Sequence, residues 1–254
     1  MSKFHKTKKK HMKKLMVLLV CIPFLAQSQR LIGGKNIVKW NVASMAFKNY
    51  HFTFERHIFK NISFSVSYRT MPKGTLPYQD LLRDQISSND IDFSKLEIGN
   101  TAITPEARIY LGLRKMRGFY FAPYVRFATF DITLPVKYTV NEGTPTAITK
   151  EALMTGKIKS TSPGLMIGYQ FHIATKVVLD FQIIGGHYGT SKGDLNFATT
   201  LNTDEQNALR TNLSEIQANP FKFTSTVNGS GAKIMSDGPW AGIRGINLGL
   251  GIRF

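Results

Sequence analysis

His187, Ser191 and Asp194 are the residues whose types suggest catalysis, because histidine beside a hydroxyl and a carboxylate can activate a nucleophile. They lie in a glycine-rich segment, and nothing in their spacing shows that the histidine reaches either partner. The sequence has no cluster with metal-ligand spacing, no glycine-rich phosphate loop and no nucleotide fingerprint. We therefore predict that the protein is not an enzyme and binds no metal and no cofactor.

Five charged residues suggest a structural chemistry instead, since each alternates with apolar residues along an extended segment. Opposite charges that share a buried face should pair, because an unpaired buried charge is very costly. We expect Arg108 and Arg126 to pair with at least one of three acids. The five residues are Glu55, Glu106, Arg108, Arg126 and Asp180.

The segments that carry these charges alternate apolar and polar residues with a period of two, which is the pattern of β-strands. In residues 62–68, for example, isoleucine, phenylalanine, valine and tyrosine face one way and three serines face the other. Eight strands are predicted in this way, at residues 36–46, 50–55, 62–69, 103–113, 119–134, 164–171, 177–183 and 245–254. Near Ala128 the apolar positions change parity, from Phe127 to Phe130, which suggests a β-bulge.

The connections alternate in length. Residues 58–61, 115–118 and 172–176 are short connections, whereas residues 71–102, 135–156 and 187–242 are long ones, and only the turn at 47–49 breaks the alternation. Short turns at one end and long loops at the other are typical of membrane β-barrels. Two of the long loops should hold helices, one at residues 77–86 and one that begins with a capping box at Thr203–Gln206 and places Leu209, Leu213 and Ile216 on one face.

Residues 1–28 are expected to be a cleaved signal peptide. Seven lysines among residues 1–14 precede an apolar stretch, and Ala26 and Ser28 are small residues before Gln29. The apolar stretch, about a dozen residues, is shorter than the roughly 20 that a spanning helix needs, and translation could start at Met1 or Met12. Lipoprotein processing at Cys21 would need a small residue at position 20, which is Val20. Cleavage removes the one cysteine and leaves residues 29–254 with a net charge of about +10.

The last segment resembles the carboxy-terminal strand that outer-membrane barrels present to their assembly machinery. Its alternating apolar residues are Ile246, Leu248, Leu250, Ile252 and Phe254. With its eight strands and its turns, the chain resembles the small OmpA/OmpX-like barrels. It is more similar to a family of uncharacterised Gram-negative outer-membrane barrels whose strands carry stretches like TPEARIY (104–110) and GFYFAPY (118–124).

The resemblance implies an all-β fold: an eight-stranded antiparallel transmembrane β-barrel with short helices in its extracellular loops, in the outer membrane of a Gram-negative bacterium. Aromatic residues would then lie at the two membrane interfaces. Tyr50, Tyr68 and Phe130 would lie near the long-loop end. Those near the short-turn end are Phe59, Phe119, Tyr169, Phe171 and Phe254.

The five inward charges would fill the lumen, because small barrels fill their interiors with side chains. A structural plug of ion pairs is the expected arrangement, and a conducting path is the alternative. The positive charge is scattered over strand ends and loops, so we expect no nucleic acid and, at the outer rim, the phosphates of lipopolysaccharide. Other expected partners are membrane lipid, the barrel-assembly machinery and another outer-membrane protein.

The sequence thus predicts a barrel that acts as a structural, surface-interaction or accessory subunit of an outer-membrane assembly. A narrow pore for small solutes or ions is the first alternative. A lipid-modifying enzyme of the outer membrane, which would use residues such as His187 and Ser191, is the second.

Overall fold

The computed structural model describes residues 34–75, 95–112, 114–215 and 220–254, without the side chains of Ala46 and Phe47. Three features of the sequence therefore lie outside the described residues: the expected signal peptide, the helix expected at 77–86, and Ile216. What the structure describes is an all-β molecule with one α-helix and one short 3₁₀ helix.

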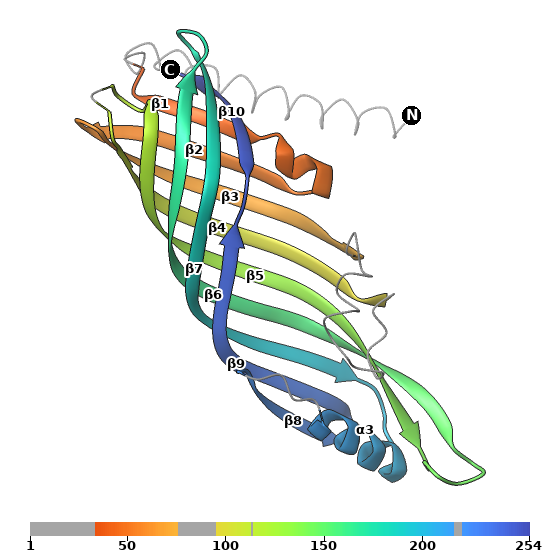
Figure 1. Cartoon of the computed structure of the whole chain (residues 1–254). Coiled ribbons are helices and arrows are strands. Elements are labelled where there is room, and N and C mark those ends of the chain that lie inside the picture. The colour runs from red at the N-terminus through yellow and green to blue at the C-terminus, as the bar shows by residue number, and fades with distance from the viewer. Residues whose placement is uncertain (1–33, 76–94, 113, 216–219) are drawn as a thin grey trace, which may run out of the picture.

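Ten antiparallel strands form a single sheet, and eight of them close a ring (Figure 1). The order runs β10-β1-β2-β3-β4-β5-β6-β7, and β7 pairs with β10 to complete the circle. The strands are β1 (Asn36–Asn41), β2 (Tyr50–Phe59), β3 (Ile62–Thr75), β4 (Glu97–Tyr110), β5 (Gly118–Val140), β6 (Ile148–His172), β7 (Val177–Ala198), β8 (Lys222–Asn228), β9 (Gly231–Arg244) and β10 (Asn247–Arg253).

Both ends of the described chain meet at one end of the ring. The backbone N–H of Asn36 donates to the carbonyl of Phe254 at 2.9 Å, and the N–H of Phe254 donates to the carbonyl of Asn36 at 2.9 Å. The short connections between β2 and β3, β4 and β5, and β6 and β7 lie at this end, as the alternation of connection lengths predicts. We call it the short-turn end.

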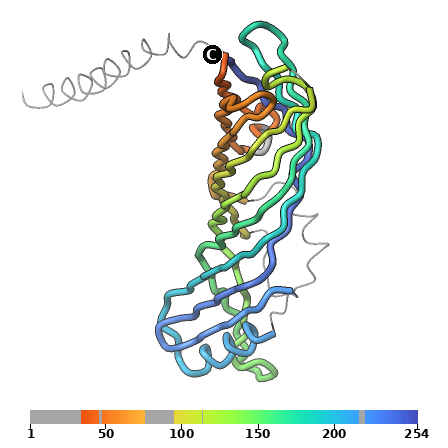
Figure 2. The backbone as a smooth tube through the Cα atoms, turned by 90° about the vertical axis from the view of Figure 1, so that its left-hand side faces the viewer, coloured from red at the N-terminus to blue at the C-terminus, as the bar shows by residue number. Residues whose placement is uncertain are grey.

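At the opposite end the sheet continues far beyond the ring (Figures 1 and 2), and here the predicted loops are wrong. Much of residues 135–156 and 187–242 is strand, since β5, β6 and β7 are 23, 25 and 22 residues long. Residues 71–75 and 97–102 are also strand, and residues 76–94 lie outside the described part of the chain. We call this part of the molecule the extension; it consists of the far ends of β5, β6 and β7 together with β8, β9 and the helix at Thr203–Glu215. The extension has an apolar core of its own, which stabilises the longer strands. Its buried residues include Val136, Tyr138, Met154, Leu195, Leu209, Leu213 and Ile234.

The same core explains why the predicted bulge at Ala128 is absent. The register is unbroken there, with Ala128 opposite Ala102 on β4 and Ser160 on β6. Phe127 faces outward and is 48% exposed, whereas Phe130 turns inward against Trp240. The apolar residues move from odd to even positions because the interior of the molecule becomes apolar beyond Phe127. The strand itself stays regular.

The first predicted strand is also too long. β1 ends at Asn41, and the 3₁₀ helix η2 (Ala43–Phe47) follows it. Asn41 terminates the strand because its side-chain oxygen accepts a hydrogen bond from the backbone of Ser44 at 3.1 Å, an arrangement that competes with sheet pairing.

The helix α3 (Thr203–Glu215) confirms the predicted helix, but its cap lies one residue earlier than Thr203. Asn202 Oδ1 accepts from the N–H of Glu205 at 2.9 Å, and the Glu205 carboxylate accepts from the N–H of Asn202 at 2.8 Å. The ammonium of Lys150 on β6 also donates to Glu205, and this hydrogen bond lowers the pKa of Glu205 and raises that of Lys150. The helix is thereby fastened over the apolar core of the extension.

No helix among the described residues is long and apolar enough to cross a membrane.

Candidate functional site

Arg108 lies at the centre of a buried ion-pair network inside the ring. Its guanidinium contacts Asp180 at 2.6 Å and Glu55 at 3.3 Å, and it also pairs with Glu106. Side chains alternate between the two faces of β4, so Arg108 points inward, between the outward residues Ala107 and Ile109. The Arg108 side chain has no exposed surface, so its charge is balanced entirely by these partners.

Lys39 is the member of the network that the sequence analysis missed. Its ammonium contacts Glu55 at 2.5 Å and Asp180 at 2.7 Å, and it donates to Gln170 at 2.8 Å. The alternation Val38, Lys39, Trp40 already placed it inward. Gly251 on β10 leaves room for the lysine, because a Cβ there would lie 2.5 Å from Lys39 Cγ.

Neutral hydrogen-bond donors complete the network. Tyr110 donates to Glu55 at 2.6 Å, Tyr120 to Asp180 at 2.8 Å, and Ser65 to Glu106 at 2.8 Å. Gly168 lets Tyr120 reach across, since a Cβ at that position would lie 2.3 Å from its hydroxyl. We call this set the inner charge network; its charged members are Lys39, Glu55, Glu106, Arg108 and Asp180.

Arg126 does not join this network, so the expectation that it pairs with an acid is wrong. Its guanidinium donates to Asn100 Oδ1 at 3.3 Å, and among the described residues no carboxylate lies within ion-pair distance of it. Arg126 lies farther from the short-turn end than Glu106 does, beside Thr104 and Ser162, where the facing strands offer hydroxyl groups and no acid.

Two more arginines lie near Arg126, and we call the three the arginine cluster. Arg69 on β3 and Arg244 at the end of β9 are close enough for all three to repel one another. Arg244 stacks over the Tyr124 ring at 4.7 Å and lies 3.7 Å from Glu106, its one acidic contact among the described residues. Of the residues that the structure describes, five cationic side chains and three acidic ones therefore lie in the interior of the ring.

The sequence could not place Arg244, because the inward and outward positions shift beside it. Arg244 and Asn247 point inward, while Gly245 and Ile246 between them are exposed. The neighbouring β7 behaves in the same way between Gln182 and Gly185, where its register with β6 also shifts. Period two counted back from Ile246 would wrongly put Arg244 outside.

The outer face of the ring is apolar and exposed. Eleven of the large side chains there leave between 38% and 50% of their surface uncovered, and stacked aromatics such as Trp40 and Phe52 continue the face from strand to strand. An exposed apolar area of this extent marks a surface that meets lipid or protein. Its members include Trp40, Phe52, Phe54, Phe64, Tyr68, Ile103, Phe121, Phe127, Leu165, Ile167 and Leu250.

The aromatic residues expected at the short-turn end do gather there. Phe119 meets Tyr169 edge to face at 4.6 Å, Tyr169 lies 4.3 Å from Phe171, and Phe59 is 59% exposed beside the turn between β2 and β3. Phe254 is half-buried where its backbone pairs with Asn36. Ile246, Leu248, Leu250 and Ile252 are all exposed on the outer face. Phe130 differs from its expected position, because it lies inside the ring against Trp240 at 4.9 Å.

His187, Ser191 and Asp194 are not assembled into a catalytic group. His187 points inward and contacts the Tyr124 hydroxyl at 3.2 Å, and Ser191 bonds the carbonyl of Gly238. Asp194 lies on the opposite face of β7, where it contacts Lys233 and Asn196. Within the described residues, no three His, Cys, Asp or Glu side chains gather closely enough to hold a metal ion.

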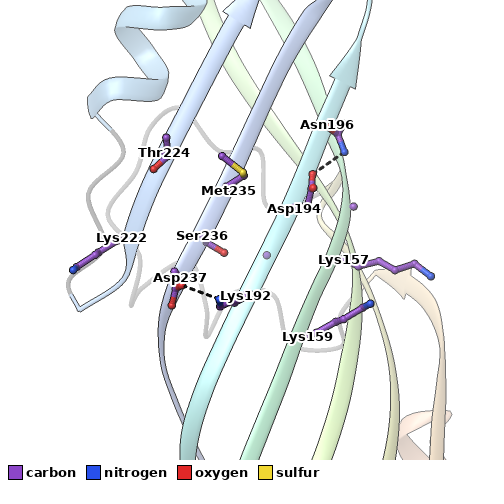
Figure 3. Close-up of a pocket in the computed structure, with 12 residues that line it drawn as sticks. Lys157, Lys159, Lys192, Asp194, Asn196, Lys222, Thr224, Met235, Ser236 and Asp237 are labelled. Carbon is purple, nitrogen blue, oxygen red and sulfur yellow. Dashed lines mark hydrogen bonds and ion pairs between the residues drawn. The ribbon is translucent and has the colours of Figure 1, made fainter.

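A basic groove lies on the exposed side of the extension (Figure 3), with a volume of about 810 Å³. Lys157, Lys159, Lys192 and Lys222 line it, together with Asp194 and Asp237. Lys192 lies 3.6 Å from Asp237, and Lys157 lies 3.4 Å from Asp131. The lining has more positive than negative charge and is open to solvent.

Fold and site together define a class: an antiparallel ring of eight strands with a charged interior and an apolar exterior. Residues 14–218 match the family described as Protein of unknown function (DUF3575), and the chain belongs to that family. The match ends before β8, so the last three strands lie beyond it. No curated protein matches the chain.

Proposed function

We propose that the protein is an integral outer-membrane β-barrel of the small OmpA/OmpX-like kind, exported through a signal peptide at residues 1–28. The observation that carries the proposal is the distribution of polarity around the ring. Charged and hydroxyl side chains are buried inside, and large apolar side chains are exposed outside. This is the reverse of a water-soluble sandwich or barrel, and it provides the apolar surface that a bilayer demands. The pairing of the eight strands around the ring satisfies their backbone groups.

The strand lengths support a membrane span. β2 has 10 residues, and a tilted spanning strand needs about 9 to 11. Arg56, which faces outward near the short-turn end, donates to Asn36 at 3.1 Å and so keeps its charge at the rim.

In this proposal the short-turn end faces the periplasm and the extension stands outside the cell. The inner charge network closes the lumen, and the protein serves as a structural, surface-interaction or accessory subunit. The extension offers the surface for such contacts. The basic groove of Figure 3 suits the phosphates of lipopolysaccharide, because ammonium groups bind phosphate oxygens with charge-assisted hydrogen bonds.

The proposal is tested by fractionation and by electrophoresis without boiling. We expect the protein to stay in the outer-membrane fraction after a urea or carbonate wash, and to migrate differently on a gel before and after heating. Release of the protein by the wash, together with one unchanged gel band, would show that the ring is not embedded.

The alternative of a narrow pore can be decided on the same purified material. In a planar bilayer the closed barrel should give no steady channels, because Arg108, Glu55 and Tyr110 are fully buried at the short-turn end. Stable unitary conductance would replace the accessory role with transport.

A further inference from the structure

Inside the ring, the arginine cluster is an excess of positive charge that the described residues do not balance. Arg69 and Arg126 have no acidic partner among the described residues, and Arg244 shares Glu106 with Arg108 and Ser65. Arg126 and Arg244 are only 8% and 7% exposed. Buried charges that repel one another are costly unless a counter-charge joins them.

Unsatisfied polar atoms gather around the same three arginines. Among the described residues, Arg69 Nε and Arg244 Nη1 are buried without a hydrogen-bond partner, and so is the hydroxyl of Ser162, which lies opposite Arg126. Two acceptors nearby are also without one: Asn49 Oδ1, and Glu106 Oε2, which lies 3.7 Å from Arg244 Nη1. Buried polar groups in proteins are nearly always paired, so a concentration of unpaired donors at one place indicates a ligand. The free donors are guanidinium N–H groups, which match the oxygens of a phosphate in a two-pronged geometry.

An opening in the wall leads from the side to Arg69 and Arg244, two of the three arginines. β1 ends at Asn41, and its pairing with β10 starts at Gly249, so nothing described pairs with the free edge of β9 between Gly238 and Arg244. A pocket of about 290 Å³ occupies this seam. It is lined by Ala43, Ser44, Asn49, Arg69, Ile243, Arg244, Gly245, Ile246 and Asn247.

We propose that Arg69, Arg126 and Arg244 form a binding site for a phosphate oxyanion, which enters through this side opening. The ligand chemistry is a tetrahedral phosphate with two negative charges, supplied either by inorganic phosphate or by a phosphomonoester lipid headgroup. The opening lies at the level of Tyr50 and Tyr68, on the side of the ring that faces the extension, where a headgroup would lie if the ring spans a membrane. The binding itself does not depend on that span.

The test uses the folded full chain in dodecyl maltoside micelles and inorganic phosphate as the probe, with chloride at equal ionic strength as reference. Calorimetry should show saturable binding of one phosphate per protein. Arg69→Gln and Arg126→Gln should each weaken it about tenfold or more, because each removes a charged hydrogen bond. The matched control is Arg117→Gln, an exposed arginine in the turn between β4 and β5, which should bind like the parent.

Phosphatidic acid in the same micelles distinguishes the two sources. Displacement of bound phosphate by the lipid assigns the site to a headgroup, and lack of displacement assigns it to free phosphate. Retention of the gel shift confirms that each variant is folded. The site is refuted if neither probe binds with saturation, or if the Arg69→Gln/Arg126→Gln double variant, still folded, binds as the parent does.

Discussion

At the scale of single residues, the two arginines that the sequence treats alike have different surroundings. Arg108 contacts three carboxylates within the inner charge network, whereas Arg126 lies among hydroxyl and amide groups. Both are buried, yet only Arg108 neutralises acids that have lost contact with water.

We therefore predict that Arg108→Ala is strongly destabilising, by about 3 to 5 kcal/mol, because it leaves buried carboxylates without their main counter-charge. Arg126→Ala should change stability far less, since it leaves no acid unpaired and relieves repulsion from Arg69 and Arg244. The temperature at which the gel shift is lost measures both. Equal losses in the two variants would mean that the carboxylates do not depend on Arg108.

The sequence could predict which residues face inward only where the strand is regular. The alternation of side chains placed Glu55 and Arg108 on the inward side of their strands, and the structure brings them together. It could not give Arg244, because the inward pattern shifts at Gly245 and Ile246. Nor could the sequence predict the partners of Arg126, since these depend on the register between β5 and its neighbouring strands.

At the scale of elements, the extension shows a similar limit. The helix α3 was predictable from its apolar spacing and its capping residues, but the strands beneath it were not. On β5, for example, the inward residues pack against a helix more than 60 positions away in sequence, since Val136 and Leu209 lie in one core. A local pattern contains no information about such a partner.

The cap of α3 provides the prediction at this scale. Asn202→Ala should speed hydrogen exchange of the first turn of the helix about fivefold, because loss of a capping side chain costs about 1 kcal/mol. Thr203→Ala is the matched control and should change exchange little, since Asn202 and Glu205 make the capping hydrogen bonds. A larger effect for Thr203→Ala than for Asn202→Ala would show that Thr203 caps the helix, as the sequence predicts.

The capping carboxylate also sets a pH limit for this helix. The pKa of Glu205 is lowered in the folded protein, first by the hydrogen bond from Lys150. A group with a lowered pKa stabilises the fold above its unfolded value, about 4.3, and the contribution is lost as the pH falls through the lowered value. The attachment of α3 is therefore complete at neutral pH and weakens only in acid.

At the scale of the whole molecule, the ring and the extension divide the protein into two regions of opposite character. In the ring the apolar side chains face outward, and in the extension they face inward against α3. The change occurs along continuous strands, near Phe127 on β5. One region suits lipid and the other suits water, so in the proposed outer-membrane barrel the boundary between them should coincide with the membrane surface.

The proposed outer-membrane barrel predicts a topology that can be tested with small epitope tags. Tags at Gly143, in the turn between β5 and β6, and at Gly229, between β8 and β9, should be reached by antibody on intact cells. Tags at Lys115 and Thr175, in the short turns, should be reached only after the outer membrane is permeabilised. Gly74 is a poor site because it pairs with Ile98 inside the sheet, so a tag there would disturb folding. Labelling of Thr175 on intact cells, with Gly143 protected, would show the opposite insertion, and labelling of all four sites would show that the ring does not span the membrane.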